Sequence, residues 1–144
     1  MFSPTQTDVR SFFTDARRKR FERLPLTPLE TIAADWIDAH PEYGADLGAA
    51  AAAPATVPAP EEGRENPFLH LSMHLSISEQ VSIDQPAGIR QAFELLARRL
   101  GSPHAAQHEV MECLGRMLWD AQHGSRPPDG EAYVDCVRRR ATRP

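Results

Sequence analysis

The sequence predicts an all-α fold, a bundle of about five to six helices in a single domain over residues 1–144. No stretch reads as a convincing strand, whereas apolar residues recur at helical spacing in several segments. Four positions place a capping residue directly before proline, which is typical of helix starts. These starts are Thr27-Pro28, Asn66-Pro67, Gln85-Pro86 and Ser102-Pro103. At 144 residues and 41% hydrophobic, the chain suffices for one buried core.

The first two helices are predicted over residues 8–23 and 28–40. The first ends in the basic run "RRKR" at 17–20. Cations are favoured near a helix C-terminus, so a solvated face explains this run, and an anion or nucleic-acid patch is the alternative. The second helix starts with a capping box, Thr27 to Glu30, and ends before Pro41, because the residue before proline disfavours the α conformation.

A flexible linker is predicted over residues 45–65, "ADLGAAAAAPATVPAPEEGRE". Apart from Leu47 and Val57 this segment has no large apolar residue. It therefore buries too little surface to offset the entropy of ordering, and we assign it no function.

Four further helices follow the linker. One covers 66–84, "NPFLHLSMHLSISEQVSID", which carries a single formal charge before its last residue, at Glu79. The next runs from 86 to 100 and stops at Gly101, and another runs from 103 to about 123 and ends at Gly124. A short last helix is capped by Asp129.

Histidines on two of these helices form the candidate site. On a helical wheel His74 lies about 40° from His70, on the same stripe as Ile77 and Val81. The helix is apolar in nearly every direction, which is typical of a buried helix, so its imidazoles need polar partners. We expect those partners on the helix over 103–123.

That helix repeats the spacing, since His104, His108 and Glu112 follow one another at intervals of four residues. If Leu118 and Trp119 are buried, the side chains of His104, His108 and Glu112 also point toward the core, because they lie along the same side of the helix. Pairs at i and i+4 on facing helices are how bundles build metal sites. The sequence therefore predicts a metal site made of His70, His74, His108 and Glu112, with His104 as fifth ligand or orienting residue.

A divalent transition metal suits this set, zinc or iron first, with manganese or nickel as further options. The alternative is a non-enzymatic structural or interaction module whose histidines are hydrogen-bonded within the core. His40 ends the apolar stripe of its helix, which makes it a further ligand candidate or a capping residue. Glu79 points away from His70, so we expect an ion pair with Arg90 or Arg98, with a ligand or base role as the alternative.

Composition narrows the other function classes. The formal net charge of -4 disfavours generic nucleic-acid binding. No stretch approaches the roughly 18 apolar residues of a membrane span, and no signal-peptide run opens the chain, so we expect a cytoplasmic protein without membrane contact. Cys113 and Cys136 lack Cys-x-x-Cys spacing and read as two buried apolar thiols. The sequence identifies no binding partner, and a second copy of the chain is one candidate. Whether the protein is an enzyme stays an open question.

Several long motifs resemble a small bacterial family of unknown function, domain-of-unknown-function family 1841. They are "PLTPLE", "DWIDAHPEY", "NPFLHLSMHL", "EQVSIDQPAGIR", "HAAQHEVMECLGRMLWDAQ" and "PPDGEAYVDC", which together span nearly the whole chain apart from the linker. The family pattern often has histidine directly after "HPEY", where this chain has Gly44. The resemblance does not indicate which activity the protein has, because the family has no established activity.

Overall fold

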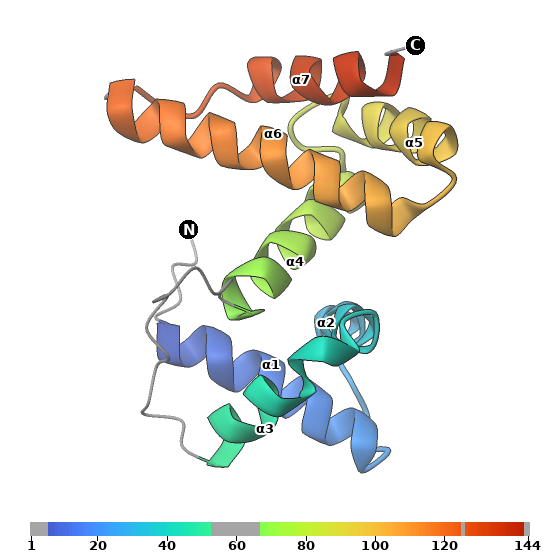
Figure 1. Cartoon of the computed structure of the whole chain (residues 1–144), viewed down its shortest axis with the longest axis vertical. Coiled ribbons are helices and arrows are strands. Elements are labelled where there is room, and N and C mark those ends of the chain that lie inside the picture. Colours follow the sequence, from blue (N-terminus) through green and yellow to red (C-terminus); the bar gives the residue numbers. More distant parts are fainter. Residues whose placement is uncertain (1–5, 53–66, 125, 143–144) are drawn as a thin grey trace. The chain divides into compact units, whose positions relative to one another are not determined.

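The computed structural model describes residues 6–52, 67–124 and 126–142, and every regular element in these ranges is helical (Figure 1). The elements are α1 (Gln6–Phe21), α2 (Pro28–Asp38), the 3-10 helix η1 (Pro41–Tyr43), α3 (Gly44–Ala52), α4 (Pro67–Ile83), α5 (Ile89–Leu100), α6 (Pro103–Gly124) and α7 (Gly130–Thr142). The predicted all-α class is confirmed.

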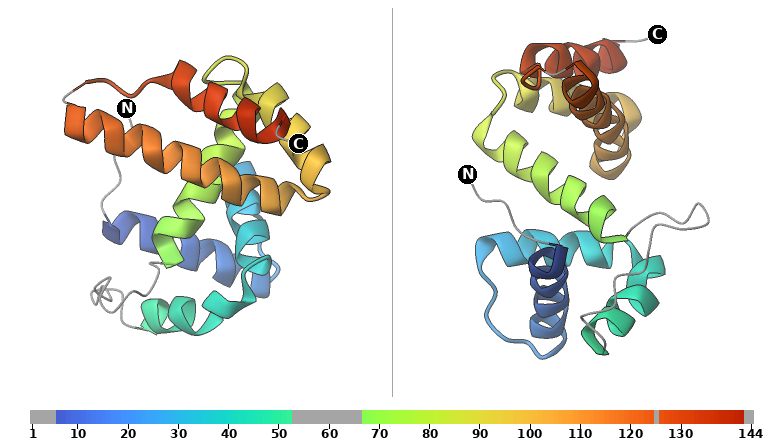
Figure 2. Two further views of the ribbon diagram at one scale, coloured as in Figure 1. Left: turned by 45° about the horizontal axis from the view of Figure 1, so that its top comes forward. Right: turned by 90° about the vertical axis from the view of Figure 1, so that its left-hand side faces the viewer.

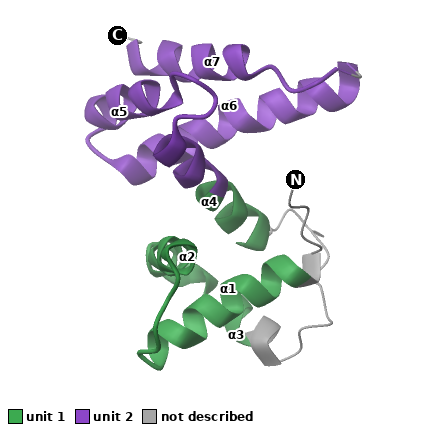
Figure 3. Ribbon diagram, turned by 180° about the vertical axis from the view of Figure 1, so that it is seen from behind, with its two compact units in different colours: residues 1–75 green, residues 76–144 purple. Residues whose placement is uncertain are grey.

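The chain divides into two compact units, residues 1–75 and 76–144, with the boundary inside α4 (Figure 3). Each unit is described by itself. In unit 1, α1 packs against α2 and α3. Its core consists of Phe13, Ala16, Ala33, Ile37, Tyr43, Leu47, Phe68 and Leu71. In unit 2, α5 packs against α6 and α7, and α6 packs against α7 (Figure 2).

Helix α2 begins as its sequence predicts. The Thr27 hydroxyl accepts a hydrogen bond from the Glu30 amide at 3.1 Å, and the Glu30 carboxylate accepts one from the Thr27 amide at 2.9 Å. This capping box satisfies two donors that a helix start would otherwise leave free. It sets the start of the helix whose last turns contain Trp36 and after whose end His40 follows.

The linker prediction is wrong for residues 45–52, because these residues lie in α3. Leu47 is completely buried in the core of unit 1, and alanine has the highest helix propensity of all residues. One buried anchor in an alanine-rich segment thus outweighs the scarcity of large apolar side chains. The rest of the predicted linker, 53–65, lies outside the described residues.

The basic run at the end of α1 is largely neutralised by ion pairs. Arg18 pairs with Glu22 at 2.6 Å, Lys19 with Glu30 at 2.8 Å, and Arg20 with Asp35 and Asp38 at 2.8 and 2.7 Å. The Lys19 ammonium, followed by the Thr27 amide, lowers the pKa of the Glu30 carboxyl. These pairs favour the solvated-face interpretation of "RRKR" over an anion-binding patch.

The start of α5 differs from the sequence prediction by three residues, since the helix begins at Ile89 and not at Pro86. The Asp84 carboxylate accepts hydrogen bonds from the Gly88 and Arg90 amides at 3.2 and 3.0 Å. Gly88 has φ 95°, and a Cβ there would lie 2.8 Å from the Arg138 side chain. The positive φ is what favours glycine at this turn, because the Arg138 guanidinium is the end of a flexible side chain and can move aside.

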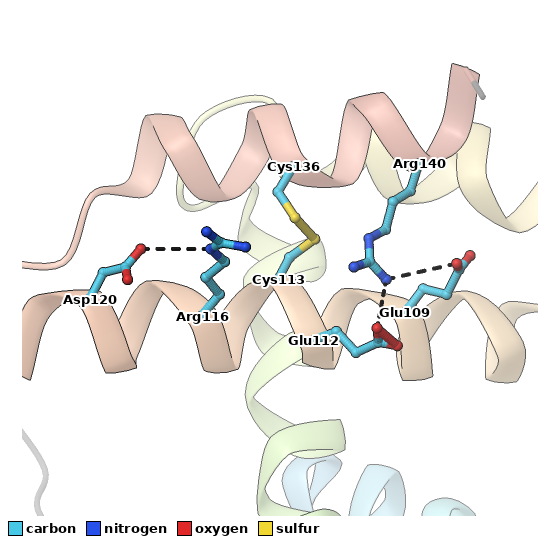
Figure 4. The surroundings of a disulfide bond; sticks show 7 residues. All are labelled: Glu109, Glu112, Cys113, Arg116, Asp120, Cys136 and Arg140. Carbon is cyan, nitrogen blue, oxygen red and sulfur yellow. Dashed lines mark hydrogen bonds and ion pairs between the residues drawn. A yellow bond between two sulfur atoms is a disulfide. The ribbon is translucent and has the colours of Figure 1, made fainter.

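The two cysteines form a disulfide between α6 and α7, so the prediction of two free thiols is wrong (Figure 4). The packing of these helices brings the Cα atoms of Cys113 and Cys136 to 5.9 Å, within the range of a disulfide. A separation of 23 residues carries no local signal of this pairing.

Candidate metal centre

Three histidines of unit 1 converge from two parts of the chain. His40 lies between α2 and η1, where Pro41 prevents α2 from continuing. His70 and His74 lie one turn apart on α4. Together His40, His70 and His74 are called the three-histidine cluster.

The Nε2 atoms of the cluster form a nearly equilateral triangle. His70 Nε2 lies 3.1 Å from His40 Nε2 and 3.1 Å from His74 Nε2, and the third side, between His74 and His40, is 3.2 Å. An ion bonded at about 2.0–2.1 Å to all three would see N–metal–N angles of roughly 100°, between octahedral and tetrahedral values. The spacing therefore fits a single small cation.

Hydrogen bonds between neutral imidazole rings account for at most two of these three contacts. His40 Nδ1 lies 2.8 Å from the Trp36 carbonyl oxygen, which can only accept, so Nδ1 donates and a neutral His40 presents a bare lone pair at Nε2. The three contacts would need three hydrogens, and only His70 and His74 could supply one each. Three lone pairs directed at one cation satisfy all of them.

The bond from His40 to Trp36 has a second consequence. Metal-binding histidines usually donate their other ring N–H to a carbonyl or carboxylate, which sets the tautomer and the ring orientation. Trp36 provides this support from the last turns of α2. The hydrogen bond to Trp36 thus orients the His40 ring with its Nε2 atom toward His70 and His74.

Aromatic rings enclose the cluster. The indole of Trp36 stacks on His74 at 3.8 Å between centroids with 12° between planes, and the Tyr43 ring lies parallel to His40 at 5.3 Å. His74 is 0% exposed and His40 is 3% exposed, whereas His70 is partly buried. The expected low-dielectric surroundings are therefore present around His40 and His74.

In unit 2, His104 and His108 lie one turn apart on α6, with ring centroids 4.5 Å apart and ring nitrogens within 4.8 Å of each other. His104 is partly buried and His108 is exposed. The two rings therefore lie side by side on α6, and their role as metal ligands stays a prediction.

Glu112 is placed differently from its predicted role. It is exposed, and its carboxylate accepts a hydrogen bond from Arg140 of α7 at 3.0 Å (Figure 4). Leu118 and Trp119, which the sequence analysis expects to be buried, are 45% and 58% exposed. The inward rotation expected for this strip is therefore absent, and we leave Glu112 out of the proposed ligand set.

Glu79 is exposed on α4, so the buried glutamate that the sequence analysis expects is not found. Arg90, one of its predicted partners, donates instead to the carbonyl oxygens of Val81 and Ser82. Leu69 is 60% exposed, which shows that α4 is not buried all round. Its buried side contains Leu71, His74 and Ile77.

His40 is the residue that sequence reasoning placed only as an alternative. Its signals are the end of an apolar stripe, Trp36 one turn earlier and a following proline, and each of these also fits a capping residue. Nothing local indicates that His40 meets His70, 30 residues later. Tertiary structure decides that contact, with the Trp36 ring of α2 stacked on His74 of α4.

Fold and site define the molecule as an all-α protein with a cluster of three histidine nitrogens in its N-terminal unit. The chain belongs to the family described as "Domain of unknown function (DUF1841)", which matches residues 5–139. No curated protein and no solved structure shows a significant match. Within the described ranges, no helix has the length and apolar character to cross a membrane.

Proposed function

We propose that the protein binds one divalent transition-metal ion through the Nε2 atoms of His40, His70 and His74. The observation that supports this proposal is the triangle of 3.1–3.2 Å contacts among these three atoms. Imidazole nitrogen suits zinc, copper, iron and nickel, whereas manganese prefers oxygen ligands. Zinc or iron is therefore the ion we expect.

Three ligands on one side of an ion leave at least one coordination position open. Zinc in such a site lowers the pKa of a bound water toward neutrality, which permits hydrolysis or proton transfer. Iron in the same site would permit redox chemistry.

The participation of His104 and His108 in the same site stays a prediction. Their i, i+4 spacing and the 4.8 Å limit between their ring nitrogens suit a pair of ligands. Metal binding by the double variant His104→Ala/His108→Ala tests it. Unchanged affinity restricts the ligands to the three-histidine cluster, and a loss of affinity adds the pair.

The decisive experiment is elemental analysis of the full chain, purified without a histidine tag and dialysed against a metal-free buffer after loading with Zn²⁺ or Fe²⁺. One equivalent is expected in the parent protein. His74→Ala and His70→Ala are expected to lose the ion, with circular dichroism as the check that both variants fold.

His123→Ala is the matched control. His123 lies 2.8 Å from the carbonyl oxygen of Trp119, four residues earlier, as His40 does from that of Trp36, but His123 is exposed. Its removal is expected to leave the metal content unchanged. A parent protein that folds but retains no metal would instead support the alternative of buried, structural histidines.

A further inference from the structure

Unit 2 contains a groove of about 1010 Å³ beside α6 and α7. It is called the α6–α7 groove. Both cysteines of the disulfide line it, together with Arg116, Tyr133, Arg139 and Arg140 among others. A disulfide whose role is only to join two helices does not need to line a groove. The Cys113–Cys136 disulfide lines one that is large enough for a small molecule.

The two sulfur-bearing residues differ in access. Cys113 of α6 is 2% exposed, whereas Cys136 of α7 is partly exposed. A nucleophile that enters the groove therefore meets Cys136 before Cys113. Attack on a disulfide proceeds through one sulfur and expels the other, so this difference predicts which thiolate leaves.

Arginines flank the bond on both sides. Figure 4 shows Arg116 extending from α6 and Arg140 from α7, one on each side of the disulfide. Arg140 is held by Glu109 and Glu112 at 3.8 and 3.0 Å, whereas the Arg116 guanidinium lies 3.9 Å from the Asp120 carboxylate and is 81% exposed. Arg116 is therefore the more available cation. A nearby cation stabilises a thiolate and makes it a better leaving group.

We propose that the Cys113–Cys136 disulfide is a thiol-exchange site for small thiols. The thiolate of the small molecule bonds to Cys136 Sγ, the Sγ–Sγ bond breaks, and its electron pair leaves with Cys113 as a thiolate beside Arg116. A mixed disulfide stands at Cys136. A second small thiolate then attacks the small molecule's sulfur in this mixed disulfide. The bond from that sulfur to Cys136 Sγ breaks, the two small molecules depart as one disulfide, and Cys136 is released as a thiolate. The protein is reduced and two small thiols are oxidised, so the electrons balance.

This inference is independent of the proposed metal site, because its residues all lie in unit 2.

The test is reaction of the oxidised full chain with reduced glutathione, followed by acid quenching, alkylation of free thiols and peptide mapping by mass spectrometry. Glutathione is expected on Cys136 and the alkylating group on Cys113. Glutathione mainly on Cys113 would overturn the proposal. So would a disulfide that reacts only after the protein is unfolded.

Single-cysteine variants provide the second measurement. With oxidised glutathione, Cys113→Ser is expected to form a stable adduct on Cys136, and Cys136→Ser is expected to react far more slowly at its buried Cys113. Equal rates would contradict the assigned order of attack.

The role of Arg116 is tested by Arg116→Gln, with Arg98→Gln on α5 as a control that also removes one exposed charge outside the groove. Removal of a nearby cation makes the Cys113 thiolate a poorer leaving group. We therefore expect slower exchange in the first variant and no change in the second. Equal rates in both would remove Arg116 from the mechanism.

Discussion

The Nδ1 atom of His40 lies 2.8 Å from the carbonyl oxygen of Trp36, one helical turn earlier. His123 has the same relation to Trp119, also at 2.8 Å. The two Trp-x-x-x-His segments thus share their local geometry and differ in surroundings, since His40 is 3% exposed and His123 is exposed. His123 therefore serves as an internal control for metal binding at His40.

Tryptophan fluorescence is expected to report metal binding through Trp36. Its indole stacks on His74 at 3.8 Å between centroids, so a paramagnetic ion such as Cu²⁺ at the cluster lies close enough to quench it. Trp119→Phe retains Trp36 and should show saturable quenching near one equivalent. Trp36→Phe retains Trp119, which stacks on His123 at 3.5 Å, and should lose most of the effect. Equal quenching in both variants would contradict the site.

Metal is expected to raise the melting temperature of the protein. A ligand that binds only the folded state at about 100 times its Kd stabilises it by about 2.7 kcal/mol. For a chain of 144 residues this corresponds to a shift of roughly 5–10 °C, measured by thermal unfolding with and without a chelator. The His40→Ala variant should show no shift. A chelator-sensitive melting temperature in that variant would place the ion elsewhere.

Reduction of the disulfide is expected to destabilise the protein. The disulfide closes a loop across 23 residues and so lowers the entropy of the unfolded chain. This effect raises the free energy of unfolding by about 3 kcal/mol at 25 °C. Urea unfolding of the oxidised protein and of the Cys113→Ser/Cys136→Ser variant measures the difference. Adding a reductant should lower the urea midpoint of the parent protein and leave the midpoint of the double variant unchanged. An unchanged midpoint in the reduced parent would show that packing alone holds α6 and α7 together.

Acid is expected to weaken the α1–α2 contact through Glu30. The Lys19 ammonium lowers the folded-state pKa of Glu30, so the folded protein binds fewer protons at this group than the unfolded chain. The stabilisation is complete above the unfolded pKa and is lost as the pH falls through the folded pKa.

The free energy of unfolding, measured by urea titration from pH 7 downward, should therefore fall less steeply in Glu30→Gln than in the parent. Lys19→Gln removes the cation and should flatten the same part of the curve. A parent slope that persists in both variants would assign the acid sensitivity to other carboxylates.

Local chemistry made most of the helices predictable. The Thr27 capping box, the Ser102 cap of α6 and the Asp129 cap of α7 each depend on residues within one turn, and all three are present. Helix α3 was missed because its stability depends on Leu47 reaching the core of unit 1, a contact that composition does not reveal.

The residues of the candidate site also fall into two groups, those that local helix spacing predicts and those that only helix packing brings together. The sequence by itself determined that His70 and His74, and likewise His104 and His108, share a helix face, because a helix repeats every 3.6 residues. Only the tertiary structure decided that His40 joins His70 and His74, that Glu112 pairs with Arg140, and that Cys113 meets Cys136. These contacts join residues on different elements, and the packing of whole helices, which no local spacing encodes, brings such residues together.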